Sequence, residues 1–599
     1  MMSDLDPSDL LALARPLEPA AWRRVNQRYL ARAIAELLHE RMVVADVRET
    51  RGGHALTVTG DDPEIRWRCV AHRRALEHWH VDPGSIVREG GGRAEAADAA
   101  QLFLDLRGAI GSDPSTLTHF LEETAQTLYA DACIEARGRP RAAVLAEADH
   151  QTVEAAMEGH PWVLVNKGRL GFSAADVTRY APEHGRSQPL LWLAAHEERA
   201  DFHAVPGLDH DRFVDDQLGA DVAARFRARL GGAAAAYRFI PVNAWQWQHK
   251  IAVQMAGDLA TGRLIPLGVG PAGYRPQQSI RTYQHATDPS RCFVKTALSI
   301  LNTFQIRGLD PRKLRLAPTV TSWLRERLGG DPVLEQTGVV LLGEVATVAY
   351  HHPVFTQVER GPYQFRELLG ALWRESPAPH LRPGETLMSM AALLYVDDHG
   401  DALVAALARR AGLPLVEWLR RYLDAYLTPL LHCFYRHETF FVAHGENTIL
   451  VLDGGAPTRV VIKDLVEEVQ VSRRVRAGLS DELRGLVYDL DDQLVPLHLL
   501  TDVFDGFFRY LGDVVATYGG VAESTFWRLV ADTVRRYQAA HPELADAFAR
   551  IDLFCPEFPC YPLNKYRMVY HGYAEAADNV HDLAPRFAGM LRNPLAVMR

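Results

Sequence analysis

The spacing of hydrophobic residues changes along the chain and predicts helices in some segments and strands in others. From about residue 20 to residue 45, apolar residues recur at intervals of three and four, which indicates a helix. Residues 54–59 alternate instead, Asp61-Asp62-Pro63 is a turn signal, and residues 65–70 resume the run, so this patch predicts a β-hairpin. Residues 95–136 return to helical spacing. The first part of the chain is therefore expected to combine helices with a small sheet.

The sharpest polar interruption of an apolar segment lies near residue 445. An apolar run ending at Val442 leads into His444-Gly445-Glu446-Asn447, a second run ends at the turn signal Asp453-Gly454-Gly455, and a third ends at Lys463-Asp464. A hairpin would bring the polar residues of its two ends together at one mouth. Amide and carboxylate oxygens are the hard ligands that Mg²⁺ prefers, and an imidazole beside them suits a phosphate chain. A ligand-free hairpin with polar residues at its mouth is the alternative.

A second polar group lies upstream and offers donors to an anion. Ser279, Arg281 and Thr282 fall within four positions, and hydroxyl and guanidinium groups of this kind bind phosphate oxygens. The following apolar run predicts a strand that ends at Lys295, and residues 296–308 are predicted to form a helix that ends at a glycine. The chain has no GxxxxGKS/T loop, which argues against a P-loop fold.

Lys167-Gly168-Arg169 is a further candidate anion-binding segment, because two cations flank a glycine that allows close backbone approach. A solvated loop is the alternative there.

The length of the chain and a proline-rich stretch predict several domains. A chain of 599 residues exceeds a single core and predicts two to four domains. The Pro-rich stretch at residues 376–383 is the candidate linker, and residues 415–431 after it have the pattern of an amphipathic helix. We expect domains at 1–150, 151–383 and 384–599.

Composition narrows the class of partner. Hydrophobic residues make up 48% and charged residues 23%, as in ordinary globular proteins. The net charge of -10 argues against general nucleic-acid binding, although a local basic pocket could still hold an anion. Six cysteines without a zinc-type spacing favour buried thiols in a reducing cytoplasm. The first 13 residues lack a signal-peptide core, and no run of 18 apolar residues predicts a membrane span.

In their order along the chain, these motifs resemble those of the NRPS-independent siderophore synthetases, the aerobactin-synthetase-like family. The residues that carry the resemblance are Gly159-His160-Pro161, Lys167-Gly168-Arg169, Ser279, Arg281-Thr282, Lys295, Arg307-Gly308, His444-Gly445, Asn447 and Lys463-Asp464. The agreement runs from about residue 150 to the end of the chain. The chain departs from many relatives in having Asn243-Ala244 in place of His-Pro and Glu446 in place of Gln, which leaves the identity of the acid open.

The resemblance implies an α+β, multidomain, cupped-hand architecture of thumb, fingers and palm, with a mainly antiparallel sheet and helices in the C-terminal palm. It implies ATP and Mg²⁺ as cofactors. The implied ATP contacts are Ser279, Arg281, Thr282, Lys295, Asn447 and Lys167. Asp464 would serve the magnesium ion. The residues implied to face the substrate carboxylate are Arg307, His444, Thr303 and Lys565.

The implied activity is ATP-dependent adenylation of a carboxylic acid, citrate or a carboxylate-bearing siderophore intermediate, followed by condensation with an amine, hydroxylamine or alcohol. AMP and pyrophosphate would be released, and a homodimer in the cytoplasm is expected. Two alternative hypotheses for the function remain open. A kinase-like phosphotransferase would release ADP, with Glu446 as its catalytic acid. A non-enzymatic scaffold or siderophore-binding protein would not turn ATP over.

Overall fold

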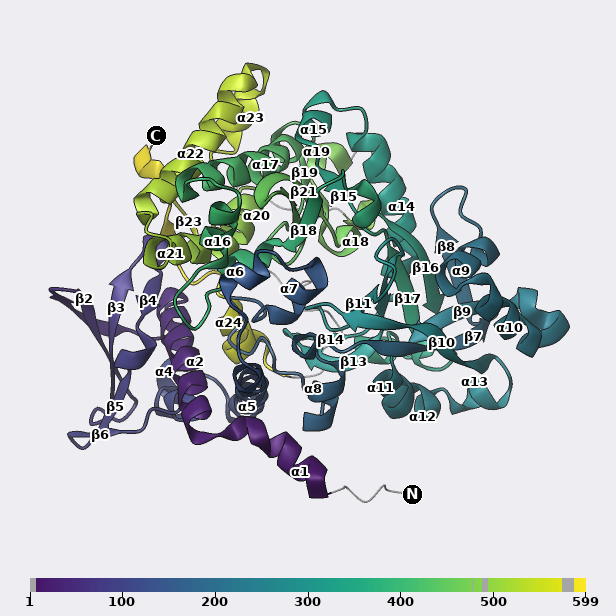
Figure 1. The fold of residues 1–599 in the computed structure, drawn as a ribbon, viewed down its shortest axis with the longest axis horizontal. Coiled ribbons are helices and arrows are strands. Elements are labelled where there is room, and N and C mark those ends of the chain that lie inside the picture. Colours follow the sequence, from purple (N-terminus) through teal and green to yellow (C-terminus); the bar gives the residue numbers. More distant parts are fainter. Residues whose placement is uncertain (1–6, 477, 487–493, 574–585, 599) are drawn as a thin grey trace.

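The computed structural model describes residues 7–476, 478–486, 494–573 and 586–598. Met1 to Asp6, part of the segment inspected for a signal peptide, lie outside these residues. Within the described ranges, no helix is both long and apolar enough to span a bilayer. Figure 1 shows the N-terminal elements on the left, a large sheet on the right and the C-terminal helices along the top. The protein is a mixed helix and sheet structure, as expected.

The N-terminal unit is a six-stranded antiparallel sheet covered by two long helices. The strands are β1 (Ala45–Thr50), β2 (Gly53–Thr59), β3 (Arg66–Arg73), β4 (Trp79–Val81), β5 (Val87–Gly90) and β6 (Arg93–Glu95). The helices are α1 (Pro7–Ala14), α2 (Pro19–His39), α3 (Ala99–Asp105), α4 (Arg107–Ile110) and α5 (Pro114–Arg137). Leu30 of α2, Trp67 of β3 and Phe120 of α5 share one core. The predicted early helix, hairpin and following helices are confirmed.

The central unit is an eight-stranded antiparallel sheet in the order β8-β16-β17-β12-β11-β10-β7-β9. Its strands are β7 (Gln188–His196), β8 (Ala200–Ala204), β9 (Tyr237–Val242), β10 (Leu264–Pro276), β11 (Thr282–His285), β12 (Phe293–Thr296), β16 (Glu344–Tyr350) and β17 (Gly370–Arg374). The helices α9 (His210–Leu218) and α10 (Ala220–Leu230) bury Phe213 and Phe226 against one face, which includes Trp373. Helix α14 (Pro311–Leu328) covers the other face, which includes Leu372.

The predicted helix at residues 296–308 is wrong, because this segment forms a hairpin of β13 (Leu298–Asn302) and β14 (Gln305–Arg307). Along β13, buried and partly exposed residues alternate, with Leu298 and Ile300 packed in a small core beside Trp245. The amide of Gln246 also holds the backbone and hydroxyl of Ser299, at 2.8 and 2.9 Å. These tertiary contacts outweigh the local helical spacing. Arg307 therefore lies at the end of strand β14, not in the last turn of a helix.

The C-terminal unit contains the central hairpin and most of the largest core. Strands β20 (Thr448–Asp453) and β21 (Ala456–Ile462) form the predicted hairpin, and the loop glycines Gly454 and Gly455 have φ of 55° and 92°, which suits a two-residue turn. The sheet is completed by β18 (Glu385–Ser389), antiparallel to β20, and by β15 (Val340–Leu341), parallel to β21. The predicted amphipathic helix is α17 (Leu415–Tyr435), which packs on α22 (Glu523–Ala540).

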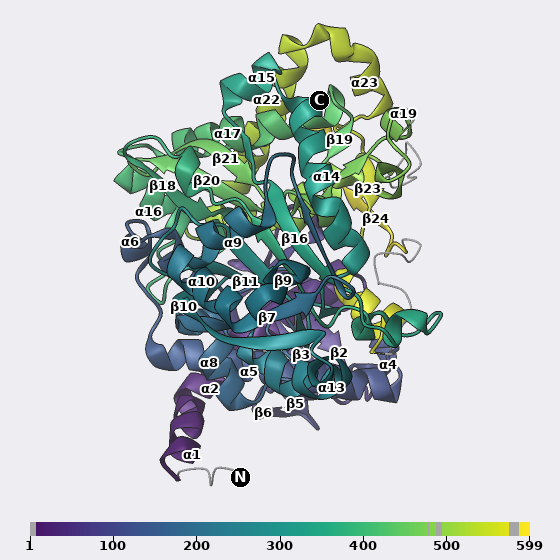
Figure 2. The ribbon, with the colours of Figure 1, turned by 90° about the vertical axis from the view of Figure 1, so that its right-hand side faces the viewer.

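The predicted linker at residues 376–383 lies between β17 and β18, which belong to different sheets. Strand β15 nevertheless comes from the central segment and joins the hairpin sheet. Figures 1 and 2 both show β18 and β21 lying above β10 and β11. The chain therefore ties the two sheets together at two places.

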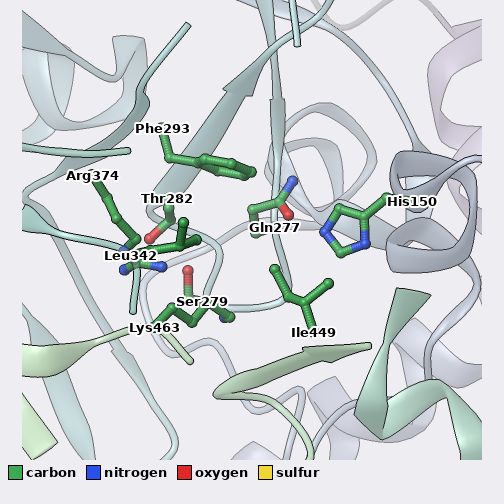
Figure 3. A pocket seen from close by; sticks show the side chains of 9 residues that line it. All are labelled: His150, Gln277, Ser279, Thr282, Phe293, Leu342, Arg374, Ile449 and Lys463. Atoms are coloured by element: carbon green, nitrogen blue, oxygen red, sulfur yellow. The ribbon is translucent and has the colours of Figure 1, made fainter. Parts of the chain in front are cut away.

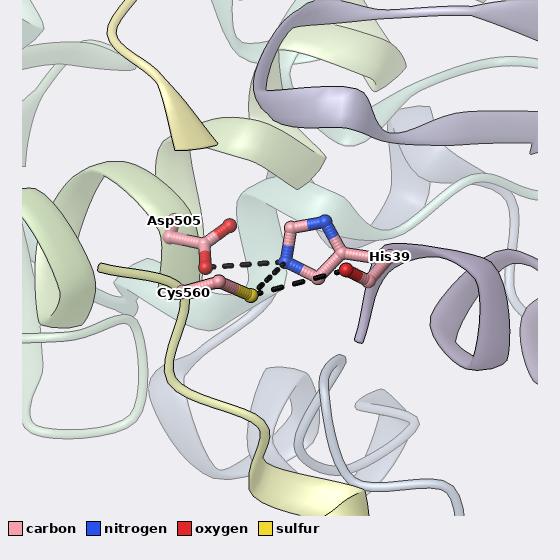
Figure 4. Close-up of side chains that lie close together, drawn as sticks. All are labelled: His39, Asp505 and Cys560. Carbon is pink, nitrogen blue, oxygen red and sulfur yellow. Dashed lines mark hydrogen bonds and ion pairs between the residues drawn. The ribbon is translucent and has the colours of Figure 1, made fainter. Parts of the chain in front are cut away.

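A fully buried polar cluster joins the N-terminal and C-terminal units. The guanidinium of Arg509 lies 3.1 Å from Glu36 on α2 and 2.9 Å from Asp505. The ring of His39 lies 3.2 Å from Asp505 and 4.0 Å from the thiol of Cys560 (Figure 4). Removing one member of such a buried ion pair typically costs about 3–5 kcal/mol, so this cluster fixes the relative position of the units.

Candidate functional site

A pocket opens between the eight-stranded sheet and the hairpin sheet (Figure 3). Its space amounts to about 300 Å³ when open solvent at the mouth is included. It is lined by His150, Gln277, Ser279, Thr282, Phe293, Leu342, Arg374, Ile449 and Lys463. Three of these residues are large and apolar, and the others carry hydroxyl, amide, imidazole or cationic groups. The lining therefore offers an apolar surface for a flat ring beside a polar surface for an anion.

Four cations surround two carboxylates beside this pocket. Lys295 on β12 lies 2.7 Å from Glu467 and 3.3 Å from Asp464. Arg374 at the end of β17 lies 2.6 Å from Asp464, and Arg281 lies 3.5 Å from Glu467. Two of the cations come from neighbouring interior strands of the large sheet, while both carboxylates follow the hairpin. The structure thus brings predicted residues more than 160 positions apart into direct contact.

Lys463 completes the cation cluster, with its ammonium 3.8 Å from Asp464. Burial would raise the pKa of Asp464, but Arg374, Lys295 and Lys463 outweigh it and hold that pKa well below the usual range. Burial would also raise the pKa of Glu467. The charges of Lys295 and Arg281 outweigh this effect, so the pKa of Glu467 is likewise well below its usual range. Both carboxylates therefore stay ionised across the working pH range and are suited to hard cations such as Mg²⁺.

Glu344 lies behind this cluster, and its pKa is shifted in the opposite direction from those of Asp464 and Glu467. It is fully buried, and one of its carboxylate oxygens accepts a hydrogen bond of 2.9 Å from the backbone N–H of Val466. Burial raises the pKa of Glu344 to about 7, against the lowering effect of Arg374 and Lys295. Unlike Asp464 and Glu467, Glu344 is therefore a carboxyl group that would change protonation state near neutral pH.

The turn before β11 presents Ser279. The backbone N–H of Gln277 donates to the carbonyl of Thr282 at 2.8 Å, and Ile280 adopts a positive φ of 63°. Among the residues that the structure describes, the buried hydroxyl of Ser279 has no hydrogen-bond partner. Because buried polar atoms are usually paired, this hydroxyl is suited to contact a ligand.

Arg307 and Thr303 lie on the β13–β14 hairpin. Arg281 donates to the carbonyl of Gly308, so the end of β14 is linked to the cation cluster. Burial and then the charge of Arg281 lower the pKa of Arg307 to about 10, which leaves it charged at neutral pH. Its buried Nε and the hydroxyl of Thr303 lack partners within the described part of the chain. The positive φ of 46° at Thr303 turns the hairpin.

His444 lies at the mouth of the central hairpin, against His160 from the loop near Lys167. The two rings are 5.5 Å apart in an edge-to-face arrangement, and Nδ1 of His444 accepts a hydrogen bond of 3.2 Å from the backbone of Glu446. Burial and then the charge of His160 lower the pKa of His444 to about 3. The imidazole is therefore neutral at working pH and would orient a substrate by hydrogen bonding.

Asn447 holds the hairpin mouth closed. Its backbone N–H donates to the carbonyl of His444 at 3.1 Å, and its own carbonyl accepts from Lys463 at 3.1 Å. Its side-chain amide donates to the carbonyl of Val442 at 3.0 Å. His444, Asn447 and Asp464 therefore share one end of the hairpin, as predicted.

The contacts of two predicted site residues lie outside this cluster. Lys167 is buried and pairs with Asp131 of α5 at 2.8 Å, and it also donates to the carbonyl of Glu158. Lys565 lies at the end of α24 (Leu563–Lys565), with its ammonium 5.9 Å from the ring of Tyr570. Within the described part of the chain, these contacts of Lys167 and Lys565 do not include the cations and carboxylates around Lys295. Their assigned roles remain predictions.

Sequence reasoning missed Arg374, His150 and Glu467 as site residues. Arg374 had a signal, because a charged residue ends the otherwise apolar strand β17. Glu467 directly follows the hairpin motif, but the acidic pair Glu467-Glu468 has no feature that distinguishes it from a solvated turn. His150, at the start of α7 (His150–Ala156), had no local signal, and only packing aims it into the pocket.

Most of the chain is similar to known protein families. Residues 149–395 match the model of the IucA / IucC family, and residues 416–577 match that of the ferric iron reductase FhuF-like transporter. The chain is 39% identical over 589 residues to the putrebactin synthase of Shewanella sp. (strain MR-4), covering 97% of this chain and 93% of that protein.

Two further similarities extend over nearly the whole chain. It is 36% identical to the rhizobactin siderophore biosynthesis protein RhbF of Rhizobium meliloti (strain 1021), with 97% of each chain covered. The solved structure of aerobactin synthetase IucC from a hypervirulent pathotype of Klebsiella pneumoniae superposes with a TM-score of 0.83 at 27% identity, covering 96% of this chain and 99% of that one.

Proposed function

This chain belongs to the IucA/IucC family, the NRPS-independent siderophore synthetases, and from that premise we propose that it is a ligase that activates a carboxylic acid with ATP. The acid would be citrate or a carboxylate-bearing siderophore intermediate. An amine, hydroxylamine or alcohol would then form the amide or ester bond. Among the relatives, one is named a putrebactin synthase, one an aerobactin synthetase and one a rhizobactin siderophore biosynthesis protein, which supports this reaction class.

The observation that carries the proposal is the meeting of Arg281, Lys295, Arg374 and Lys463 around Asp464 and Glu467. ATP and a carboxylate are both anions, and their approach needs cations that offset the repulsion. In this arrangement Ser279, Arg281, Thr282 and Lys295 would hold the phosphates. Phe293, Leu342 and Ile449 supply an apolar surface for the base.

Asp464 and Glu467 have the donor set that a magnesium ion requires, since both are ionised oxygen ligands. When bound, Mg²⁺ would supply charge neutralisation to the phosphates. The carboxylates are paired with cations in the ligand-free chain, so nucleotide binding would exchange one set of ion pairs for another. The cations would turn to phosphate oxygens, and the carboxylates would turn to the metal.

The acid would bind beside Arg307, Thr303 and His444. A substrate carboxylate oxygen would attack the α-phosphorus of ATP, the bond to the β-phosphate oxygen would break, and pyrophosphate would leave. The nucleophile would then attack the acyl carbonyl, and AMP would leave with the electrons of the acyl–oxygen bond. Arg307 would offset charge on the acid, and neutral His444 would orient it, so positioning would contribute much of the rate.

The cellular setting proposed is the cytoplasm, where ATP is available. The six cysteines of the chain all lie within the described residues and form no disulfide bonds, which is consistent with a reducing compartment.

Product analysis tests the reaction. The purified protein should convert ATP to AMP and pyrophosphate only when a suitable acid is present, and a panel of di- and tricarboxylic acids in ATP–pyrophosphate exchange should identify that acid. Formation of ADP instead would establish the phosphotransferase alternative. No nucleotide turnover with any acid and nucleophile would favour the binding-protein alternative.

A further inference from the structure

Three potential metal ligands meet away from the nucleotide pocket, where α15 (Pro332–Thr337), the end of α17 and the segment before β19 (Thr439–Phe440) converge. One oxygen of Asp331 lies 3.0 Å from Nε2 of His432 and 2.9 Å from Nε2 of His437. One ligand atom from each of the three residues lies within 4.8 Å of the others. None of the three lines the pocket described above.

The groups behind these ligands hold them in a fixed orientation. The other oxygen of Asp331 accepts hydrogen bonds from the backbone N–H groups of Val333 and Leu334, at 2.9 and 3.1 Å. Nδ1 of His432 lies 3.0 Å from the hydroxyl of Tyr537. Support of this kind, behind the atoms that face the ion, is typical of histidine and carboxylate metal ligands in proteins.

The backbone beside His437 is held in an uncommon conformation. Glu438 has a positive φ of 45°, and its carboxylate is fixed by Arg550 at 2.9 Å and by the hydroxyl of Ser472. A strained residue that its surroundings fix is often part of a functional arrangement. Here the strained residue directly follows the ligand His437.

The ligands are held but accessible. The side chain of His432 is 4% exposed, whereas those of His437 and Asp331 are 16% and 13% exposed, which leaves a route for an ion. By contrast, His39, Asp505 and Cys560 are sealed from solvent, and Asp505 already pairs with Arg509 (Figure 4). The Asp331 cluster is therefore the better candidate for exchangeable metal.

We propose that Asp331, His432 and His437 form a binding site for a divalent first-row transition ion, distinct from the magnesium site of the proposed reaction. Two imidazoles and one carboxylate on one face are typical ligands of such ions. Metal–ligand bonds of about 2.0–2.2 Å place neighbouring donor atoms roughly 3.2–3.5 Å apart, so the two spacings between Asp331 and the histidine nitrogens need only a small expansion to admit an ion.

Proton positions are compatible with both states of the site. Without metal, both Nε2–H groups donate to Asp331, and the hydroxyl of Tyr537 donates to Nδ1 of His432. With metal on Nε2, the His432 proton moves to Nδ1 and is accepted by the same hydroxyl, because a tyrosine hydroxyl both donates and accepts. The ring of His541 is 5.2 Å from that of His432, and a water molecule or this side chain completes the coordination.

Bound metal would brace the proposed active site from two sides. Helix α15 leads directly into β15, which pairs with β21 of the central hairpin. His437 precedes His444 by seven positions, and the chain between them runs through β19. An ion that links Asp331 to His437 therefore restrains both approaches to the hairpin mouth.

The test uses the full-length protein after chelator treatment and dialysis. In buffer saturated with Mg²⁺, Co²⁺ is titrated while its visible absorption is followed, and Zn²⁺ is titrated calorimetrically. The wild type should bind at a single tight site and should unfold at a higher temperature with Zn²⁺. His437→Asn, which retains a side-chain donor towards Asp331, should fold normally, bind at least about 10-fold more weakly and lose the thermal shift.

Two control variants distinguish this site from the other histidine clusters. Cys560→Ser removes a ligand of the buried cluster, and Glu446→Gln removes one beside His160 and His444. Both should titrate like the wild type. Titration that is unchanged in His437→Asn, or that is lost in either control, would overturn the proposal. Should His437→Asn fold poorly, Asp331→Asn provides the same comparison, since its side-chain oxygen can still accept the backbone hydrogen bonds.

Discussion

Lys295 and Glu467 form an ion pair, with Nζ 2.7 Å from Oε2, across the junction of the eight-stranded sheet and the segment after the central hairpin. Lys295 belongs to β12, and Glu467 belongs to α18 (Leu465–Glu468). A cation assigned to phosphate thus already has a carboxylate partner. In the proposed reaction, nucleotide and carboxylate compete for this cation.

Lys295→Ala and Arg281→Ala should each weaken ATP binding by about 1.5–3 kcal/mol, because each removes a charged hydrogen bond to phosphate. Glu467→Gln should have the opposite effect on magnesium-free ATP binding, since it removes the competing carboxylate. Calorimetric titration measures all three. Arg263→Ala, which removes a surface pair with Glu198 in the connections at one end of the same sheet, serves as the matched control and should bind ATP normally. Wild-type affinity in both cation variants would refute the phosphate assignment.

Asp464→Asn should raise the magnesium concentration needed for half-maximal activity, because an amide is a weaker ligand for a hard cation than a carboxylate. The measurement is initial rate against Mg²⁺ at saturating ATP. Asp453→Asn, at the far end of the same hairpin, is the control. Superimposable magnesium curves for the wild type and Asp464→Asn would contradict the metal assignment.

Arg307→Ala should lower acid activation by about 10²-fold or more while ATP affinity changes little, since Arg307 is assigned to the acid and to the developing charge. Hydroxylamine trapping of the activated acid measures the first quantity, and nucleotide titration measures the second. Arg307→Lys should recover part of the rate by restoring charge, and Arg315→Ala, at an exposed position of α14, is the control. Normal trapping by Arg307→Ala would refute its role.

Glu344→Gln should stabilise the protein above about pH 5. The pKa of Glu344 is raised from 4.5 to about 7 in the folded state. As pH rises through this window, the unfolded chain loses the proton while the folded chain keeps it, so the wild type loses stability and the variant does not. The difference should be absent below pH 4.5, grow up to pH 7 and reach about 3 kcal/mol at pH 8.

Denaturant unfolding at several pH values between 4 and 8 checks this prediction. Asp464→Asn provides a control of opposite sign. The pKa of Asp464 is depressed in the folded state from an unfolded value of 3.8, so its stabilising contribution is fully present above that pH, and Asp464→Asn should be destabilised by a constant amount between pH 4 and 8. A stability difference between Glu344→Gln and the wild type that does not vary with pH would contradict the assignment.

Gly445→Ala should destabilise the hairpin mouth by about 1–3 kcal/mol, because overpacking forces neighbours to shift. An added Cβ would lie 2.6 Å from the ring of Phe507 and 3.0 Å from Cα of Ala391. Thermal unfolding measures the loss. Gly257→Ala in α13 (Ala256–Ala260), where nothing lies within 4 Å, should be neutral or slightly stabilising. Equal unfolding temperatures for the two variants would show that the mouth tolerates the methyl group.

The elements that sequence predicted best are those whose pattern is local. Helix α17 buries one apolar stripe, and the β20–β21 hairpin needs only two apolar runs with Gly454-Gly455 between them. Residues 296–308 were predicted wrongly because the segment fits two patterns at once: Ala297, Leu301 and Phe304 have helical spacing, whereas Leu298 and Ile300 alternate as in a strand. The contacts with Trp245 and Gln246 that select the strand come from a distant segment.

The sequence by itself determined the family, the chemistry of the charged motifs and the closeness of His444, Asn447 and Asp464, because a short hairpin forces that closeness. Only the tertiary structure decided which cations meet which carboxylates. Arg374 and Glu467 enter the site because β17 and α18 converge, while Lys167 turns to Asp131 because α5 passes beside it. Charge and spacing specify what a side chain can bind, whereas the packing of distant elements selects the partner that it meets.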